Sequence, residues 1–210
     1  LRKDFINNFS HEFKTPIVSI SGFADLLLEE QLPPEDQKEY LTIIRDESRR
    51  LADLATNILT LNRVESQTIL TDKAAFPLDE QLRQSVLVTQ QKWRQKELDF
   101  DADLAPAEYT GSEGLLKEVW LNLLDNAAKH GGAGRRIDAS LTREGTVQVV
   151  RVRDYGPGVP AAELPYVKQK FYKGSSKARG SGIGLAVCDE IVRLHGGTFD
   201  IANAEGGGAV

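Results

Sequence analysis

The 210-residue sequence contains no methionine, a single cysteine and no long apolar run. No stretch approaches the roughly 20 consecutive apolar residues that a helix needs to span a bilayer, and no signal segment opens the chain. Because the sequence begins at Leu1 without an initiating methionine, we expect a fragment of a longer protein. Any membrane-spanning part of that protein is expected to lie outside this fragment.

An excess of positive charge is also lacking, since the formal net charge is −5. General nucleic-acid binders usually carry a positive net charge and a basic stripe, so we expect no nucleic-acid partner. The single cysteine, Cys188, cannot form a disulfide within the chain. Its apolar helical neighbourhood predicts a buried thiol and fits a reducing compartment.

Residues 1–66 carry apolar side chains at the alternating spacing of four and three that is typical of packed helices. The pattern is broken at Leu32-Pro33-Pro34 and then resumes to about Ser66, which predicts a helical hairpin. A lone hairpin cannot enclose a core, so we expect two chains to pair in a four-helix bundle, giving a homodimer. The alternative is that the hairpin packs on the rest of its own chain.

Helix and strand signals alternate from residue 76 to residue 210, and residues 67–75 read as a linker. Helices are predicted near 78–95, 112–130 and 182–195, and strands near 98–100, 136–142, 146–153 and 198–202. Residues 155–181 are rich in Gly, Lys and Ser and have little periodicity. They predict a mobile loop of the kind that covers a ligand.

His11 lies outside the apolar seam of the first predicted helix. Glu12 is adjacent and Thr15 shares its face, while Pro16 removes one helical N–H and should loosen the helix just after the histidine. A neutral imidazole offers one nitrogen as a nucleophile, and a neighbouring carboxylate can hold the N–H of the other. The alternative for a histidine on a helix is a solvated surface residue.

This segment reads Phe9-Ser10-His11-Glu12-Phe13-Lys14-Thr15-Pro16 and resembles the phosphoacceptor box of sensor histidine kinases, His-Glu-x-x-Thr-Pro. The resemblance implies that His11 is the phosphorylated residue and that Glu12 is the assisting base. It also implies that Thr15 positions water when the protein dephosphorylates its partner.

Three further segments have the chemistry of a nucleotide site. Asn122, Asn126 and Lys129 share one helical face, where amide oxygens suit Mg²⁺ and the ammonium suits phosphate. Asp154 ends a predicted strand before a glycine-containing turn, where its carboxylate can accept a hydrogen bond from adenine. Residues 180–184 form a glycine loop before a helix, and helix N-termini favour phosphate. Each signal alone also fits a solvated asparagine pair, an ordinary turn or an ordinary glycine loop.

A fourth segment, Phe171-Tyr172-Lys173, lies between Asp154 and the glycine loop. In sequence order the four segments resemble the N, G1, F and G2 boxes of the histidine-kinase ATPase domain, which is similar to those of gyrase, Hsp90 and MutL. The implied fold is multidomain: an all-α hairpin forming a dimeric four-helix bundle, then an α/β sandwich ATP-binding domain. The implied ligands are ATP and Mg²⁺, with Asn126 and Asn122 as metal ligands. The nucleotide-binding residues implied by these boxes are Asn122, Asn126, Lys129, His130, Asp154, Gly156, Gly158, Phe171, Lys173, Gly180, Gly182, Gly184 and Leu185.

The implied activity is ATP-dependent autophosphorylation of His11, followed by transfer to an aspartate of a response-regulator receiver domain. Lys168 stands where the family usually has Phe, and Gln169 where an acid is common; the sequence leaves their effect on lid packing and nucleotide affinity open. The resemblance also implies that the chain is the cytoplasmic portion of a membrane-anchored protein, whose sensor region lies outside this fragment. His195, at a helix end, is expected to cap the helix. The competing functions are a nucleotide-binding signalling module without transfer activity and an ATP-driven clamp, which leaves the His11 helix unexplained.

Overall fold

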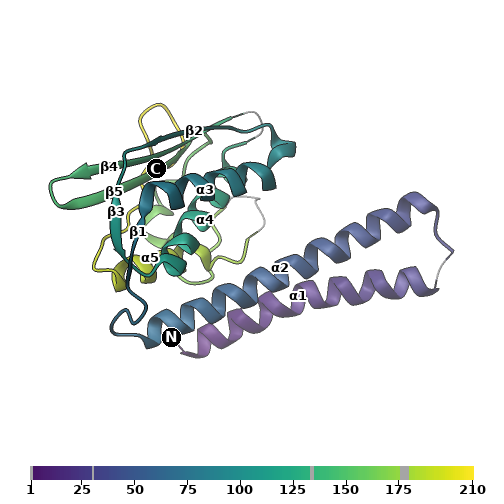
Figure 1. Cartoon of the computed structure of the whole chain (residues 1–210). Coiled ribbons are helices and arrows are strands. Elements are labelled where there is room, and N and C mark those ends of the chain that lie inside the picture. Colours follow the sequence, from purple (N-terminus) through teal and green to yellow (C-terminus); the bar gives the residue numbers. More distant parts are fainter. Residues whose placement is uncertain (1, 30, 133–134, 176–179) are drawn as a thin grey trace.

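The computed structural model describes residues 2–29, 31–132, 135–175 and 180–210, with side chains from Ile6 onward (Figure 1). A long helical hairpin forms one part, and an α/β domain lies against one end of it. The predicted order, hairpin first and α/β domain second, is confirmed. In the described ranges no helix combines the length and the apolarity needed to cross a membrane.

The hairpin consists of α1 (Arg2–Glu29) and α2 (Pro34–Ser66), which run side by side. Pro34 opens α2, where the missing N–H costs nothing, and Glu35 and Asp36 in the first turn favour the positive end of the helix dipole. Far from the α/β domain, Phe23 of α1 meets Tyr40 of α2 with ring centroids 4.9 Å apart. These contacts hold the two helices together near their connecting turn.

The α/β domain has helices packed on one face of a three-stranded sheet, and a second, two-stranded sheet beside it (Figure 1). In the larger sheet β4 (Arg136–Glu144) is central, parallel to β2 (Asp99–Leu104) and antiparallel to β5 (Val147–Asp154). The smaller sheet pairs β1 (Ala74–Pro77) with β3 (Glu108–Gly111). The covering helices are α3 (Leu78–Lys92), α4 (Glu113–His130) and α5 (Gly184–Leu194).

Several predicted boundaries differ from the structure. The helix expected near 78–95 ends at Lys92 and is followed by the 3₁₀ turn η1 (Arg94–Lys96), and β2 extends well beyond the expected residues 98–100. Strands β1 and β3 were not predicted, because they are short, and β1 occupies the last two residues of the expected linker. Residues 155–181 contain one more short turn, η2 (Leu164–Tyr166), and residues 176–179 lie outside the described residues.

The strand expected near 198–202 is wrong, because these residues have no strand partner along their length. The chain instead folds back on itself, so that Ala202 and Val210 exchange two backbone hydrogen bonds of 2.9 Å. The carbonyl of Ala209 then accepts the N–H of Asp154, 2.9 Å away, at the end of β5. This turn therefore brings the last residues next to the predicted adenine-reading carboxylate.

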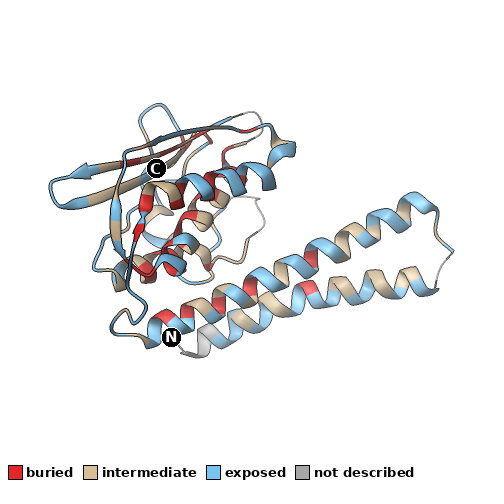
Figure 2. Cartoon of the chain, viewed as in Figure 1, coloured by how far each residue is buried: buried red, intermediate tan, exposed pale blue. Residues whose placement is uncertain are grey.

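The main core joins the hairpin to the α/β domain (Figure 2). The second half of α2 buries four apolar residues in this core and packs against α5: Leu54, Ile58, Leu61 and Val64. Fully burying one such side chain contributes about 1.5–3 kcal/mol. For this half of α2, the hairpin therefore packs on the rest of its own chain, which was the alternative to pairing with a second hairpin.

Other apolar residues of the hairpin stay exposed, among them Ile17, Val18 and Leu41, each more than half exposed. Cys188 of α5, by contrast, is fully buried in the main core, which confirms the predicted thiol environment. Burial raises the pKa of the Cys188 thiol far above its usual range. The thiol is therefore un-ionised and unreactive.

Candidate active site

Residues 9–16 of α1 present His11 on the outer face of the helix. Phe9 and Phe13 pack partly against the main core, with ring centroids 4.6 Å apart, and His11 between them in sequence is exposed. The hydroxyl of Thr15 donates to the backbone carbonyl of His11 at 3.1 Å. The helix continues through the buried Pro16, whose ring nitrogen cannot donate to the carbonyl of Glu12. The imidazole is thus open to an approaching phosphoryl group.

Glu12 is held by two cations from different parts of the molecule. The ammonium of Lys173, in the segment 155–181, lies 2.6 Å from each carboxylate oxygen of Glu12. The guanidinium of Arg50, on α2, donates to Oε2 of Glu12 at 3.2 Å. The structure therefore links the carboxylate beside His11 to Lys173, which the sequence assigned to the nucleotide.

The polar face of α4 carries the two predicted metal ligands. The Asn122 amide nitrogen donates to the Glu118 carbonyl at 3.0 Å, which leaves its side-chain oxygen outside that bond. A Cβ on Gly184 would lie 2.9 Å from this oxygen, so Asn122 adjoins the glycine loop. Asn126, one turn on, is half-buried, and its side-chain amide makes no hydrogen bond with the residues that the structure describes. Both amide oxygens can therefore accept a ligand.

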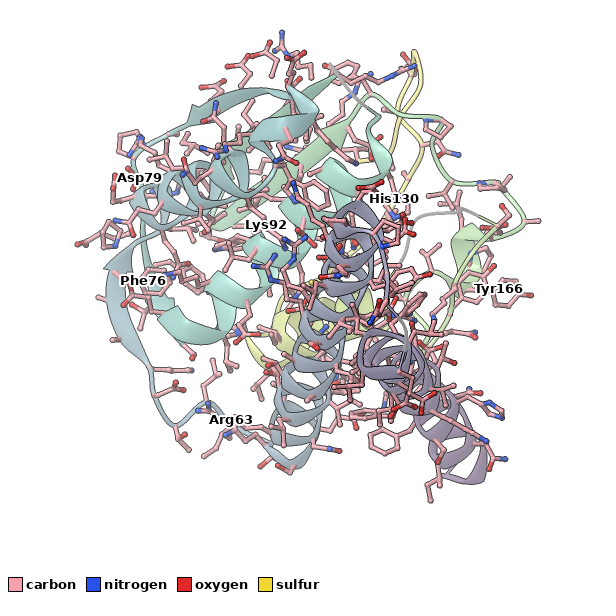
Figure 3. All side chains as sticks on the ribbon, turned by 90° about the vertical axis from the view of Figure 1, so that its right-hand side faces the viewer. Arg63, Phe76, Asp79, Lys92, His130 and Tyr166 are labelled. Carbon is pink, nitrogen blue, oxygen red and sulfur yellow. The ribbon has the colours of Figure 1, made fainter. Side chains whose placement is uncertain are left out.

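Lys129, predicted to bind phosphate, forms an ion pair with Asp125 at 2.6 Å. Lys92 reaches the same carboxylate from α3 at 2.7 Å, and the Trp93 indole donates to it at 2.8 Å (Figure 3). Burial by itself would raise the pKa of Asp125, but the two lysines outweigh burial and hold it below its usual range. Sequence reasoning missed Asp125, although its spacing of four from Lys129 was the available signal.

Asp154 lies buried at the end of β5, as the sequence predicted for the adenine reader. Its Oδ1 accepts the backbone N–H groups of Gly156 at 2.8 Å and Ala209 at 3.3 Å. Its Oδ2 makes no hydrogen bond within the described part of the chain, so one oxygen can accept from a base. Gly156 must be glycine, because a Cβ there would lie 2.5 Å from the His130 carbonyl oxygen.

His130 ends α4 next to this turn (Figure 3). Part of its side chain is exposed, yet the surrounding protein removes enough water to lower its pKa. The nearby Asp154 carboxylate opposes this shift, and Lys129 adds to it. The ring is therefore neutral near pH 7 and can line an uncharged nucleoside. Gly158, two residues after Gly156, has φ +73 and adjoins Asn203.

The glycine loop packs directly on the segment 155–181. Gly182 has φ +69, and a Cβ there would lie 2.7 Å from the backbone of Phe171 and of Tyr172. Phe171 itself adopts φ +63, a conformation that non-glycine residues rarely take, while its side chain packs on the main core. Gly180 has open space around it, and Gly184 and the half-buried Leu185 begin α5.

Among the described residues, no side chain caps the N-terminus of α5, which Ile183 precedes. The first N–H groups of a helix lack partners within the helix, and they favour phosphate. In the described ranges no group of three His, Cys, Asp or Glu side chains could hold a metal ion. The site thus offers amide oxygens, backbone N–H groups and one carboxylate, a set suited to a nucleotide with a hard cation.

Two family models match the chain. Residues 1–67 match the His Kinase A (phospho-acceptor) domain, and residues 111–210 match the Histidine kinase-, DNA gyrase B-, and HSP90-like ATPase. The cytoplasmic segment of histidine kinase QseC is 30% identical over 78% of this chain and 89% of that chain, with a TM-score of 0.53. The chain belongs to the sensor histidine kinases.

Two further relatives show how far the similarity extends. Histidine kinase ThkA, solved in complex with the response regulator protein TrrA, is 25% identical over 98% of this chain and 59% of that chain, with a TM-score of 0.81. Sensor protein SrrB of Staphylococcus aureus strain MRSA252 is 28% identical over 99% of this chain and 37% of its own length. This histidine kinase chain thus spans little more than a third of that relative. The predicted fold class is confirmed.

Lys168 attaches the lid, the described part of residues 155–181, to the rest of this histidine kinase. Its ammonium donates to the Phe199 carbonyl at 2.8 Å and pairs with Asp189 of α5 at 3.3 Å. The backbone carbonyl of the following Gln169 accepts the N–H of Tyr172 at 3.1 Å. The sequence expectation flagged both positions, and the structure shows an ionic anchor at Lys168.

His195 links the two helices that form the kinase's nucleotide site. Its Nδ1 lies 2.8 Å from the Ile191 carbonyl near the end of α5, and its Nε2 accepts the backbone N–H of Ser112 at 3.1 Å. Ser112 is the N-cap residue of α4. The predicted helix-end role is confirmed, and the second bond to α4 is a role that only the structure reveals.

Proposed function

We propose that this histidine kinase core uses ATP to phosphorylate its own His11 and passes the phosphoryl group to an aspartate of a response-regulator receiver domain. The observation that carries the proposal is the contact of Lys173 with Glu12, because it brings the lid of the ATPase domain to the residue beside His11. The complex of ThkA with TrrA supports the choice of partner.

Each proposed nucleotide-binding residue has a specific role. Oδ2 of Asp154 accepts a hydrogen bond from the amino group of adenine, and Gly156 and Gly158 let the backbone lie close to the base. His130 lines the nucleoside with a neutral ring. The phosphates meet the N-terminus of α5 together with one group of residues from the glycine loop, lid and α4: Lys129, Phe171, Lys173, Gly180, Gly182, Gly184 and Leu185. For Lys129 and Lys173 this requires release from Asp125 and Glu12.

Mg²⁺ is the proposed metal, with Asn126 and Asn122 as its protein ligands. Amide oxygens are hard ligands, and Mg²⁺ typically completes its coordination with water and substrate phosphates. The free amide of Asn126 and the position of Asn122 beside the glycine loop fit this role. The cation, when bound, neutralises charge on the phosphates.

The transfer step needs placement more than covalent help from the protein. One imidazole nitrogen of His11 attacks the γ-phosphorus, the bond to the bridging oxygen breaks, and ADP leaves with that electron pair. The proton on the other ring nitrogen passes to the Glu12 carboxylate. For this step Glu12 must exchange its contact with Lys173 for one with His11.

Thr15 has a separate proposed role in dephosphorylating the partner. Its hydroxyl proton is engaged by the His11 carbonyl, while the oxygen lone pairs remain able to accept from water. On an exposed helix face beside His11, this hydroxyl can orient a water molecule toward the phosphorylated aspartate of the partner. Thr15 should therefore affect dephosphorylation and leave autophosphorylation at a similar rate.

We also propose a homodimer with hairpin residues 1–66, linker residues 67–75 and catalytic residues 76–210. The apolar residues left exposed on α1 and α2 supply the surface for pairing two hairpins in a four-helix bundle. Anchoring to a membrane is assigned to a sensor region outside this chain, in line with the greater length of the sensor relatives.

Incubation with γ-labelled ATP tests the proposal, with acid lability identifying a phosphohistidine. His11→Gln should abolish labelling and leave nucleotide affinity within about twofold, because the two sites lie on different domains; Asn126→Ala should lower Mg²⁺-dependent labelling with His11 intact. Label retained on His11→Gln would contradict the phosphosite. An unlabelled wild-type protein that binds ATP would instead indicate the signalling module without transfer activity.

A further inference from the structure

A chain of charged side chains leads from inside the hairpin to Glu12. Glu47, on the seam of α2, is only 8% exposed. Nη1 of Arg50, one turn later, lies 3.4 Å from Oε2 of Glu47, and Nη2 lies 3.2 Å from Oε2 of Glu12. One guanidinium therefore bridges a buried carboxylate on α2 and the carboxylate beside His11 on α1.

Arginine is suited to this bridge. Its planar guanidinium presents several N–H donors in a fixed fork, so that two carboxylates can be held at a set angle. A buried carboxylate requires a partner charge, which keeps the Arg50 head group against Glu47. With the guanidinium fixed in this way, Oε2 of Glu12 is held, and Oε1 lies outside the Arg50 hydrogen bond.

In the proposed reaction, one of the two cations on Glu12 leaves the carboxylate and the other stays. Lys173 belongs to the lid, and its ammonium is required at the phosphates in the proposed transfer. Arg50 belongs to the same hairpin as Glu12, joined to α1 by helix packing. When Lys173 leaves Glu12, the bond from Arg50 therefore remains and sets the position of the carboxylate.

We propose that Arg50 is a positioning residue for the phosphorylation of His11, acting through Glu12. Anchored on Glu47, it holds Oε2 of Glu12, so that Oε1 can accept the proton from the second imidazole nitrogen as the first bonds to phosphorus and ADP departs. This inference rests on the proposed role of Glu12 as the assisting base. Glu47 and Arg50 together then determine how the base lies on the helix.

Three variants test the proposal on the intact chain. Arg50→Gln should lower the rate of His11 labelling at saturating ATP by roughly 10–100-fold, the range expected when a charge-assisted contact that orients a reacting group is lost. The KM for ATP should stay within about twofold, because the side-chain partners of Arg50 are Glu12 and Glu47, and neither is a proposed nucleotide-binding residue. Arg50→Lys should recover part of the rate. The matched control is the exposed neighbour Arg49, and Arg49→Gln should behave as wild type.

A double-mutant cycle separates positioning from a structural role. In the Glu12→Gln background, Arg50→Gln should have little further effect, because its action passes through Glu12. An equal loss in both backgrounds overturns the inference, as does a wild-type rate for Arg50→Gln. If Arg50→Gln fails to fold, the double variant Glu47→Gln/Arg50→Gln takes its place, because it leaves Glu47 without an unpaired charge. Its labelling rate must then show the reduction of roughly 10–100-fold predicted for Arg50→Gln. A wild-type rate for Glu12→Gln would instead refute the proposed base, a failure distinct from that of Arg50 alone.

Discussion

The two ends of the hairpin differ in what covers their apolar residues. Where α2 meets the α/β domain, Leu61 and Val64 are buried in a core shared with α5. Toward the turn between α1 and α2, Val18 and Leu41 are more than half exposed, although they lie on well-formed helices. One end of the hairpin is thus completed by its own chain, and the other still presents the surface expected for a partner hairpin. The α/β domain, with its buried helix faces, needs no second chain.

The largest expected effect comes from deleting a core side chain of the α/β domain. Leu124 of α4 is fully buried, and Leu124→Ala should lower the free energy of unfolding by about 2–5 kcal/mol. The exposed Leu87 of α3, in the same domain, is the matched control, and Leu87→Ala should change the free energy of unfolding by less than about 0.5 kcal/mol. Urea unfolding of both variants measures the difference. Equal losses would show that the outer face of α3 is as well packed as the core.

A smaller effect is expected at the glycine that touches α4. Gly156→Ala places a methyl group against the His130 carbonyl and should cost about 1–3 kcal/mol of stability, together with a loss of ADP affinity. Gly114, in the first turn of α4, has open space around its Cβ position, so Gly114→Ala should be neutral or stabilising by up to about 1 kcal/mol. Thermal unfolding and ADP titration follow both effects. An unchanged ADP affinity in Gly156→Ala would contradict the placement of the nucleoside.

Next comes the pH dependence of the link between α4 and α5. Burial lowers the pKa of His195, so the folded chain binds its proton less readily than the unfolded chain does. Stability is therefore fully present above the unfolded value of about 6.5 and falls as the pH drops from there toward the lowered folded pKa. His195→Gln should make the loss of stability with falling pH less steep. Part of the loss should remain, because the pKa of His130 is also lowered in the folded chain. Unfolding midpoints measured from pH 5 to pH 8 check the slope, and an identical slope in the variant would argue against His195.

The smallest expected effect concerns the ionic anchor of the lid. Lys168 is partly exposed, and exposed ion pairs contribute about 0–1 kcal/mol and weaken with salt. Lys168→Met should therefore change ADP affinity by only a few-fold at low salt and remove part of its salt dependence. The control is Asp200→Asn, because Asp200 is a more distant and almost fully exposed partner of Lys168. This variant should change ADP affinity less than Lys168→Met does. Titrations at two salt concentrations distinguish the variants.

Much of the fold could be predicted because local patterns were strong. The proline break at residues 32–34, the heptad-like spacing and the apolar faces of α4 and α5 each report on neighbouring residues in the chain. The short strands β1 and β3 carry too few residues for a pattern, and each depends on the other for its hydrogen bonds. The prediction of a strand near 198–202 was wrong for a related reason: Ala202 of this segment pairs with Val210, eight residues later in the same turn, and not with a strand of the sheet.

In the candidate site, too, local motifs gave some residues and the structure alone gave others. The motifs around His11, Asn126 and Asp154 supplied residue types and their order, and the structure adds Asp125, Asn203 and Arg50 as their partners. Asn203 binds both backbone groups of Val159, at 2.7 and 2.8 Å, and so secures the turn after Asp154. Arg50 lies 38 residues from Glu12 in sequence, so no local pattern could pair the two.

The sequence alone identified the candidate reactive side chains, because reactive groups and helix periodicity are encoded over a few residues. Only the tertiary structure decided which charges meet, since ion pairs such as Lys173 with Glu12 join residues 161 positions apart. Such contacts depend on how α2 packs on α5 and where the lid then lies, and that arrangement results from burying apolar surface across the whole chain.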